Sequence, residues 1–380
     1  MKRRLIVLSE IIAPYRIPVF NALAARNDTD LHVIFLSETD SSLRQWRVYK
    51  DEIRFSFQVL PSWRYRLGRY NLLLNRGVGT ALRKFAPHAV LCGGYNYLAT
   101  WQAARWARRN KIPLLLWSES TSNDLRREFR VVEGAKIRFL RLCSAFVVPG
   151  RSSREYLIHL GVADKNIFVA PNALDIDFYA ELARRARARP DEVRARLHLP
   201  SRYFLFVGRL VPEKGVFDLL DAYFLLEDSE RSQVGLVIAG DGVSRSALEK
   251  RAAGIRAGCV RFTGFAQREQ LAELYALAEA LVFPSHTDPW GFVVNEAMAC
   301  GLPIIASKVA GCVAELVADG ENGFVVSPGD IEELADAMRR IVSNPALAAE
   351  MGAHSAARIQ GFTPAAWAAG IAEAVRFACG

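Results

Sequence analysis

Short, continuous apolar runs alternate with amphipathic stretches along this 380-residue chain. Such runs indicate strands buried on both faces, and apolar residues three or four positions apart indicate helices that cover them. The strands predicted in the first half are Leu5–Ser9, Leu31–Leu36, Ala89–Cys92, Leu114–Trp117, Ala145–Val148 and Ile167–Ala170. Those in the second half are Tyr203–Val207, Gly235–Ala239, Val260–Thr263, Ala280–Phe283, Pro303–Ala306 and Gly323–Val326. The helical segments include Leu98–Arg109, Ile137–Leu142, Ser152–Leu160, Phe217–Leu226, Gln270–Ala278 and Ile331–Val342.

This alternation predicts an α/β protein with two doubly wound, Rossmann-like domains, each built on a parallel sheet. We expect the first domain over residues 1–172 and the second over 201–362. An Arg- and Ala-rich helical stretch, broken at Pro190, would link them over residues 173–200. A last helix is expected over residues 363–380.

The last predicted helix has a typical beginning, with Thr363 as the cap and Pro364 at the first position. Trp367, Ile371 and Val375 then mark one apolar face at helical spacing. From the spacing alone, this face could pack on either domain.

Composition agrees with two folded domains, since 51% of the residues are hydrophobic and 23% are charged. The six cysteines lie far apart without a Cys-x-x-Cys pair, so we expect free thiols in a reducing cytoplasm rather than a zinc site or disulfides.

Glu10 and Arg16 interrupt the one apolar run that looks like a signal peptide, so Leu5–Leu8 is interpreted as a buried strand. No apolar run reaches the ~18 residues of a transmembrane helix.

Two cations follow the first predicted strand of the second domain, in the run from Gly208 to Gly215. Arg209 comes directly after the strand, and Lys214 lies five positions later. Ligands of open parallel sheets bind beyond the carboxyl ends of the strands, where an Arg fork and a Lys ammonium suit a diphosphate. A solvated surface pair, for example with Glu213, is the alternative.

A carboxylate is predicted inside a buried helix over residues 292–300, which is apolar on nearly every side. A buried carboxylate is costly without partners, so Glu296 is expected to have some. It could accept hydrogen bonds from the two hydroxyls of a ribose, or it could pair with an internal cation.

The turn before this helix offers a second carboxylate, Asp288, which is either a sugar ligand or an ordinary turn aspartate. Gly291 would let the backbone approach a ligand closely. The first amides of the helix, at Phe292 and Val293, would then face phosphate or sugar oxygens. The combination of cations and carboxylates indicates a nucleotide-sugar site, although no single member does.

Two further turns could border the same site, but each is a weak signal alone. Gly240-Asp241-Gly242 follows a predicted strand, yet Arg245 replaces the third glycine of the dinucleotide-binding fingerprint. Backbone groups near Gly264 and Phe265 could meet the edge of a base.

These segments together resemble the retaining nucleotide-sugar glycosyltransferases of family 4, which have the GT-B fold. Asp288 and Glu296 are similar to the family's two glutamates, which seven residues separate. Residues 309–325 resemble the segment that follows in the family. The resemblance covers most of the chain and is most specific from Tyr203 to Pro328.

The resemblance implies roles for individual residues. Arg209 and Lys214 would hold the diphosphate of the donor, and Glu296 would hold the ribose hydroxyls. The backbone of residues 291–293 would contact the donor sugar and phosphate. Asp288 stands where the family has its first glutamate and is one methylene shorter.

The resemblance also implies an architecture and a mechanism. Two domains would face a central cleft, the first binding the acceptor and the second the donor, and the last helix would return to the first domain. The acceptor would attack the face from which the diphosphate leaves, so the anomeric configuration is retained. The leaving diphosphate would take the acceptor's proton, and no metal or other cofactor is expected.

The first half departs from the family's pattern. Glu10–Pro18 replaces a Gly-Gly loop after the first strand, and Ser118–Ser120 replaces a segment with a histidine. Arg16, Tyr95 and Glu119 are candidates on the acceptor side by position. A purely structural role, as a cap or an ion pair, is the alternative.

Charge points to an anionic partner for the first half. Residues 1–190 hold 32 Lys and Arg against 16 Asp and Glu, whereas the remainder holds 17 against 24. Trp63–Gly77 mixes Arg with Trp, Tyr and Leu, a composition that suits an anionic membrane surface and a lipid-linked or polysaccharide-precursor acceptor. The alternative is a loop and helix with solvated arginines. Nucleic acid is not expected, because no nucleic-acid-binding motif is present.

Three other functions stay open. A sugar-nucleotide epimerase or a phosphorylase can share this architecture, and a protein that binds sugar nucleotides without turnover is possible because Asp288 and the first loop differ from the family. UDP is the expected nucleotide because it is the commonest in the family. The sugar and the acceptor are left open.

Overall fold

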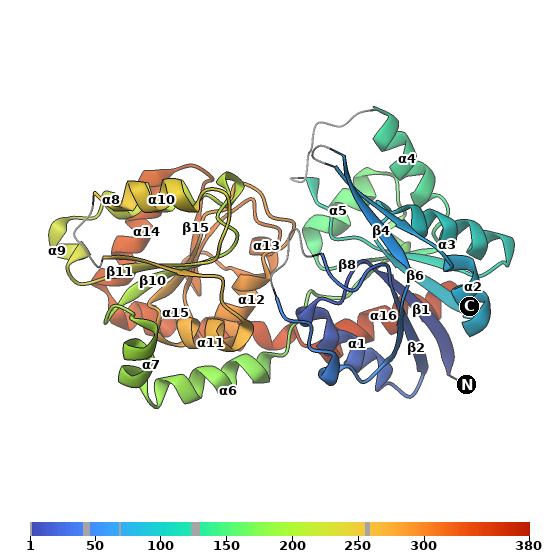
Figure 1. Ribbon diagram of the computed structural model, residues 1–380, viewed down its shortest axis with the longest axis horizontal. Coiled ribbons are helices and arrows are strands. Elements are labelled where there is room, and N and C mark those ends of the chain that lie inside the picture. The colour runs from blue at the N-terminus through green and yellow to red at the C-terminus, as the bar shows by residue number, and fades with distance from the viewer. Residues whose placement is uncertain (1, 41–45, 68–69, 123–129, 255–258) are drawn as a thin grey trace. The chain divides into compact units, whose positions relative to one another are not determined.

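The computed structural model describes all residues except 1, 41–45, 68–69, 123–129 and 255–258 (Figure 1). The chain divides into two compact units. The first comprises Met1–Leu174 together with Phe362–Gly380, and the second comprises Asp175–Gly361. Each unit is a parallel sheet with helices on both faces, as the alternation of apolar and amphipathic segments predicts.

The sheet of the first unit has the order β3-β2-β1-β6-β7-β8-β9, and all its pairs are parallel. Its strands are β1 Arg3–Ser9, β2 Thr29–Phe35, β3 Ser56–Val59, β6 Ala89–Gly93, β7 Leu114–Trp117, β8 Ala145–Val148 and β9 Ile167–Val169. Residues 5–8 of β1 are buried, which confirms the interpretation of this run as a strand. The edge strand β3 was not predicted, because its residues are only half-buried and lack a continuous apolar run.

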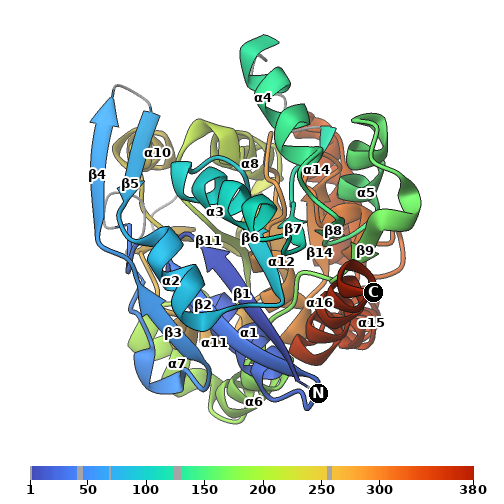
Figure 2. The same ribbon diagram turned by 90° about the vertical axis from the view of Figure 1, so that its right-hand side faces the viewer.

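Two separate cores cover the two faces of this sheet. Leu5 and Val7 face a core shared with α1 (Ile17–Ala24) and α16 (Pro364–Cys379), which lie side by side (Figure 2). Ile6 and Leu8 face the opposite core. That core contains residues of α2 Val78–Phe85, α3 Leu98–Arg109, α4 Arg130–Leu140 and α5 Arg151–His159.

The last helix belongs to the first unit, as the resemblance implies. Thr363 caps it by accepting a hydrogen bond from the amide of Ala366 at 3.2 Å, and Trp367, Ile371 and Val375 are all buried. A Cβ at Gly370 would lie 2.1 Å from the carbonyl oxygen of Val169, so only glycine allows the helix to lie this close to β9.

An antiparallel hairpin of β4 (Ser62–Leu67) and β5 (Tyr70–Asn75) forms a separate small sheet in this unit. The alternative of a loop and helix over residues 63–77 is therefore wrong for most of this segment. Trp63 and Tyr65 point outward and Arg64 between them points inward, which is the alternation of a strand. The sequence did not show this pattern clearly, because its partner strand contains three consecutive leucines, Leu72–Leu74.

The sheet of the second unit has the order β12-β11-β10-β13-β14-β15 and is also parallel. Its strands are β10 Tyr203–Val207, β11 Gly235–Ala239, β12 Val260–Gly264, β13 Ala280–Phe283, β14 Ile304–Ser307 and β15 Gly323–Val326. Every one lies within a residue of its predicted bounds, because each is a continuous apolar run.

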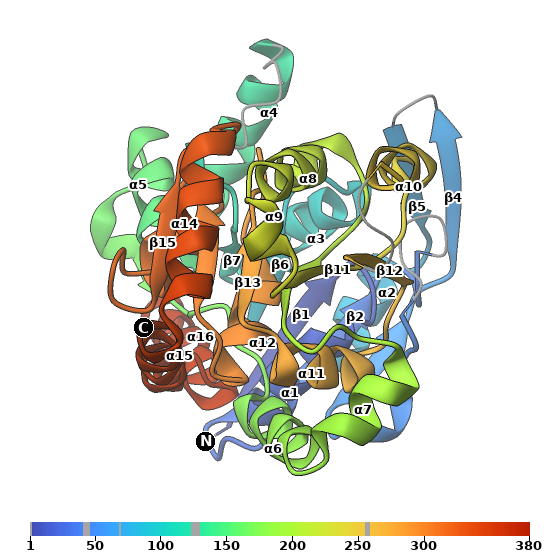
Figure 3. The ribbon, with the colours of Figure 1, turned by 90° about the vertical axis from the view of Figure 1, so that its left-hand side faces the viewer.

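Helices cover both faces of this second sheet (Figure 3). One face packs against α8 Val216–Phe224, α10 Arg245–Ala252 and α14 Ile331–Ser343. On the other face, the Tyr203 hydroxyl donates to the carbonyl of Leu274 in α11 (Arg268–Leu277) at 2.7 Å. Here α6 Ile176–Arg187 packs on α11 and on α12 Phe292–Ala299. The remaining helices of the unit are α7 Pro190–Leu197, α9 Asp228–Arg231, α13 Val313–Leu316 and α15 Pro345–Arg358.

Within the described part of the chain, no helix has the length and apolar character needed to cross a bilayer. All six cysteines are free thiols.

Candidate active site

The candidate residues of the second unit surround the point where its strand order reverses. β10 lies between β11 and β13, and the loops after β10 and β13 carry Arg209, Lys214 and Asp288. Doubly wound sheets bind ligands beyond the carboxyl ends of the strands at such a reversal. The two runs that stand out in the sequence therefore meet at one edge of one sheet.

Backbone hydrogen bonds join the loops that border this point. The amide of Gly208 donates to the carbonyl of Ala239 at 3.0 Å, and the amide of Gly240 donates to the carbonyl of Gly264 at 2.8 Å. Gly240 has a φ of 144°, and a Cβ there would lie 1.8 Å from the carbonyl oxygen of Gly208. This position accepts only glycine, which brings the loops after β10 and β11 into direct backbone contact.

Lys214 forms an ion pair with Asp288 across the reversal point. It ends a single 3-10 turn, Pro212–Lys214, and the two paired side chains are only 14% and 15% exposed. The next residue, Gly215, has a φ of 65°, and a Cβ there would lie 2.1 Å from the carbonyl oxygen of Pro284. Glycine thus lets the lysine turn lie against the loop after β13.

Arg209 differs from Lys214 in that its side chain is exposed. Among the described residues, its guanidinium has no hydrogen-bond or ion-pair partner, and the surface pair with Glu213 that was an alternative does not form. One cation of the loop is therefore already neutralised by a carboxylate, whereas the other is available to an anion.

A fixed turn leads from Asp288 into α12. Asp288 accepts a hydrogen bond from the amide of Trp290 at 3.1 Å, and the buried Trp290 ring donates from Nε1 to Asn295 at 2.9 Å. Gly291 precedes the helix with a φ of 98°, where a Cβ would lie 2.7 Å from the ring of Phe283. Asp288 is thus both a turn aspartate and a member of the ion pair.

Glu296 is held by two tyrosine hydroxyls rather than by a cation. Tyr179 of α6 donates to Oε1 at 3.0 Å, and Tyr275 of α11 donates to Oε2 at 2.8 Å. Burial raises the pKa of Glu296 to about 7, although both hydroxyls act in the opposite direction. The expectation of buried partners is confirmed, but the internal cation that was one of the two alternatives is wrong.

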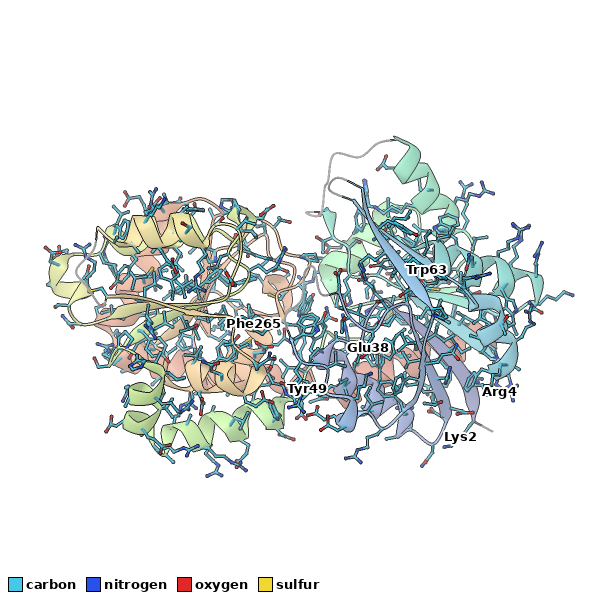
Figure 4. The ribbon with its side chains drawn as sticks, in the orientation of Figure 1. Lys2, Arg4, Glu38, Tyr49, Trp63 and Phe265 are labelled. Atoms are coloured by element: carbon cyan, nitrogen blue, oxygen red, sulfur yellow. The ribbon has the colours of Figure 1, made fainter. Side chains whose placement is uncertain are left out.

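Phe265 projects from the loop between β12 and α11 (Figure 4). Phe265 is 40% exposed. It follows Gly264, whose carbonyl accepts the hydrogen bond from Gly240. An exposed aromatic ring therefore borders the same set of loops.

Comparison with known proteins identifies the family. The model of the family described as "Glycosyl transferases group 1" matches residues 190–358, and the model of "Glycosyltransferase Family 4" matches residues 20–178. A glycogen synthase of Mycobacterium tuberculosis is 34% identical over 332 residues, which is 82% of this chain and 74% of that protein. This protein belongs to the family 4 glycosyltransferases.

Other similar proteins agree with the GT-B fold. A D-inositol 3-phosphate glycosyltransferase of Frankia alni is 35% identical to this glycosyltransferase over 201 residues, which is 50% of this chain and 49% of that protein. A crystal structure of Anabaena HepE in complex with UDP and glucose superimposes with a TM-score of 0.77 at 20% identity, covering 98% of both chains. The expected fold is thereby confirmed.

Two of the acceptor-side candidates of the glycosyltransferase form an ion pair in the first unit. Arg16 follows β1 and pairs with Glu119, which follows β7. Arg16 also donates to Asn172 at 3.1 Å and lies over the ring of Trp117, with Cζ 4.1 Å from the centroid. The structural alternative for Arg16 and Glu119, an ion pair, is what the residues form here.

The third candidate, Tyr95, follows β6 in the same unit. Its ring packs on Phe139 with centroids 6.1 Å apart, and its carbonyl accepts a hydrogen bond from Trp101 Nε1 at 3.0 Å. Tyr95 thus anchors the loop after β6 to the core through α3 and α4.

The two tyrosines that hold Glu296 are absent from the sequence prediction. Tyr179 lies 117 positions and Tyr275 21 positions from Glu296, so no local motif connects them. The signal that could have found them is a tyrosine on the apolar face of each helix, because a buried hydroxyl needs a polar partner.

Across the described residues, no three His, Cys, Asp or Glu side chains lie close enough together to hold a metal ion.

Proposed function

We propose that this glycosyltransferase moves a sugar from a nucleoside diphosphate to a hydroxyl acceptor, with retention of configuration and without a metal. The observation that supports this best is the convergence at the β10–β13 reversal of an available arginine, a lysine–aspartate pair and the start of α12. Cations suit the diphosphate, and carboxylates suit the hydroxyls of ribose and sugar.

Arg209 and Lys214 would hold the diphosphate. Arg209 is exposed and can bind two phosphate oxygens through its planar fork. Lys214 has three N–H donors, so it can bind a phosphate oxygen while it keeps contact with Asp288. Asp288 would then accept a hydrogen bond from a hydroxyl of the donor sugar with Oδ1, which also accepts the Trp290 amide and has a further lone pair.

Glu296 would bind the ribose. Each of its oxygens accepts one tyrosine hydroxyl, and a carboxylate has about four lone-pair sites. The remaining sites suit the two hydroxyls of a ribose. Tyr179 and Tyr275 would fix the carboxylate in the orientation that this contact needs.

The nucleotide is proposed to be UDP. The support is the structural similarity to HepE, which binds UDP in its crystal structure, and the exposed ring of Phe265, which could stack on a base. The backbone of Gly240 and of residues 291–293 would complete the donor contacts.

In the chemical step, the bond between the sugar C1 and the diphosphate oxygen breaks. The acceptor oxygen bonds to the same face of C1, and its proton passes to the leaving diphosphate. Arg209, Lys214 and the first amides of α12 would stabilise the charge that grows on the leaving oxygen, worth about 3–4 kcal/mol per well-placed donor. No protein nucleophile is needed.

The acceptor is proposed to be a lipid-linked or polysaccharide-precursor glycan at the cytoplasmic face of a membrane. The support is the excess of Lys and Arg in the first 190 residues, 32 against 16 Asp and Glu. An anionic lipid surface attracts such a cationic unit.

A thermal-shift screen with UDP-, GDP- and ADP-sugars tests the donor, and a melting temperature raised most by a UDP-sugar is expected. NMR of the product then gives the anomeric configuration, which should match that of the donor, and EDTA should leave turnover unchanged. Conversion of the donor to an epimer without acceptor would instead establish an epimerase. Donor binding without transfer to any hydroxyl acceptor would establish a non-catalytic protein.

A further inference from the structure

The β4–β5 hairpin presents an apolar face to solvent. Trp63, Tyr65 and Leu72 are 44%, 56% and 50% exposed. The strand register places Trp63 opposite Leu74 and Tyr65 opposite Leu72, so these four side chains lie on one face of the hairpin. Figure 4 marks Trp63 on β4. Two aromatic and two aliphatic side chains on one outer face form a patch rather than scattered exposed residues.

The opposite face fixes the hairpin to the first unit. Arg64 donates to Asp40 at 2.8 Å, and Glu10 of the loop after β1 lies 3.5 Å from the same nitrogen. Leu73 is 2% exposed, and Asn75 donates to the carbonyl of Leu36 at 2.6 Å. The apolar face is therefore held outward by polar and apolar contacts on its back.

The hairpin belongs to an acid-free stretch of the chain. Residues 53–118 contain eleven Lys and Arg and no Asp or Glu. The hairpin lies against α3, which packs on α2 (Figure 2). The exposed cations of α2, α3 and the residues just after α3 are Arg83, Lys84, Arg105, Arg108, Arg109 and Lys111. This stretch of the chain therefore contributes only cations to the surface around the hairpin.

We propose that the hairpin is a membrane-docking element, in which the Trp63–Tyr65–Leu72 face enters the interface of a bilayer and the cations of α2 and α3 bind anionic headgroups. Trp and Tyr favour the membrane–water interface because each has an apolar body and a polar end. Basic residues beside an apolar face are typical of proteins that lie on anionic membranes. The inference rests on the proposed acceptor at a membrane, but it does not use the donor site.

A lipid surface suits this combination better than the other candidate occupants. A nucleic acid would match the charge, yet it would leave the leucines of the outer face without an apolar partner. A second copy of the chain would bring a second set of cations to the contact and would have to overcome their repulsion.

The test is sedimentation of the full chain with vesicles of phosphatidylcholine alone and with one third phosphatidylglycerol. We expect binding to the anionic vesicles that is at least tenfold stronger than to neutral ones and that is weakened by high salt. The triple variant Trp63→Ser, Tyr65→Ser, Leu72→Ser should lose at least tenfold in partitioning. A matched control, Ile158→Ser with Leu225→Ser, removes exposed apolar side chains elsewhere and should bind like the wild type.

Fluorescence gives a second measurement that does not depend on the triple variant folding. Brominated lipids should quench the emission of the wild type, and Trp63→Phe should lose most of that quenching. No binding to anionic vesicles at low salt overturns the proposal, as does equal binding by the triple variant. A concentration-dependent dimer or nucleic-acid complex that the triple variant abolishes, without vesicle binding, assigns the face to that occupant instead.

Failure of this inference is distinguishable from failure of the proposed function, because the vesicle assay contains no donor. The melting-temperature shift with a UDP-sugar, measured on the same preparations, reports on the donor site alone.

Discussion

Each of the two units pairs a cation with a carboxylate between loops at the carboxyl ends of its strands, but the settings of the two ion pairs differ. In the second unit, Lys214 pairs with Asp288 while Arg209 stays exposed on the same loop. In the first, Arg16 pairs with Glu119 but is only 8% exposed and lies against Trp117. The second unit therefore keeps a cation available to an anionic ligand, whereas the first covers its cation.

The backbone differs in the same way. The loops after β10 and β11 use glycines where a Cβ would collide with a neighbouring loop, at Gly215 and Gly240. The loop after β1 also forms a 3-10 turn, Pro14–Arg16, but residues 10–18 contain no glycine. Glycine loops let the backbone approach a ligand, so the comparison favours the second unit as the binding site for the phosphates.

The largest expected effect comes from Lys214→Ala. Loss of this cation should lower turnover at saturating donor by about 10²–10³-fold, because the charge on the leaving diphosphate loses a stabilising donor. Steady-state kinetics with the donor identified by thermal shift measures it. Lys250→Ala, which removes an exposed lysine of α10, is the matched control and should behave like the wild type. If the turnover of Lys214→Ala were close to that of the control, Lys214 would not bind the diphosphate. The contrast drawn between the loops of the two units would then not hold.

An intermediate effect is expected from the titration of Glu296, whose pKa is about 7 against an ordinary 4.5. Between these values the folded chain keeps a proton that the unfolded chain has lost, so the contribution of this group to stability falls as pH rises from about 4.5 to 7. Ribose binding needs the carboxylate, so donor affinity should rise over the upper part of the same window and level off above pH 7. Donor binding roughly tenfold weaker at pH 6 than at pH 8 is expected by calorimetry.

Two variants test whether Glu296 causes this pH dependence of donor affinity. Glu296→Gln should flatten the pH dependence. Tyr275→Phe should move it to higher pH, because the tyrosine hydroxyl stabilises the carboxylate form. A flat profile in the wild type would contradict the role of Glu296 in donor binding.

The smallest effect is expected in the first unit, from Glu119→Gln. Loss of the carboxylate leaves Arg16 with weaker partners, at a cost of about 1–2 kcal/mol in unfolding free energy, while the donor-induced shift in melting temperature should persist. Denaturant titration and the thermal-shift assay measure the two quantities. Glu181→Gln, which removes the solvent-accessible ion pairs of Glu181 with Arg184 and Arg185 on α6, serves as the control and should melt like the wild type. If Glu119→Gln abolished donor binding, the assignment of phosphate binding to the second unit alone would not hold.

Buried strands were predictable from the sequence because each is a continuous apolar run, as in Tyr203–Val207 and Leu114–Trp117. The hairpin was not predictable, because it is a separate two-stranded sheet with one face in solvent, so the apolar residues Trp63 and Leu72 are exposed rather than buried. Lys214 and Asp288 were both singled out, but their ion pair joins positions 74 residues apart and depends on strand order. The partners of Glu296 could not be predicted for the same reason, since Tyr179 and Tyr275 lie on two other helices.

The position of α16 in the first unit has a consequence for synthesis of the chain. Residues 362–380 leave the ribosome after the whole of the second unit, yet Trp367 and Ile371 fill the core formed by β1 and α1. The second unit is contiguous in the sequence and can fold as soon as it has emerged. The first must wait, with one face of its sheet uncovered, until residues 362–380 have also emerged, so its exposed apolar surface is the part of the nascent protein that most needs a chaperone.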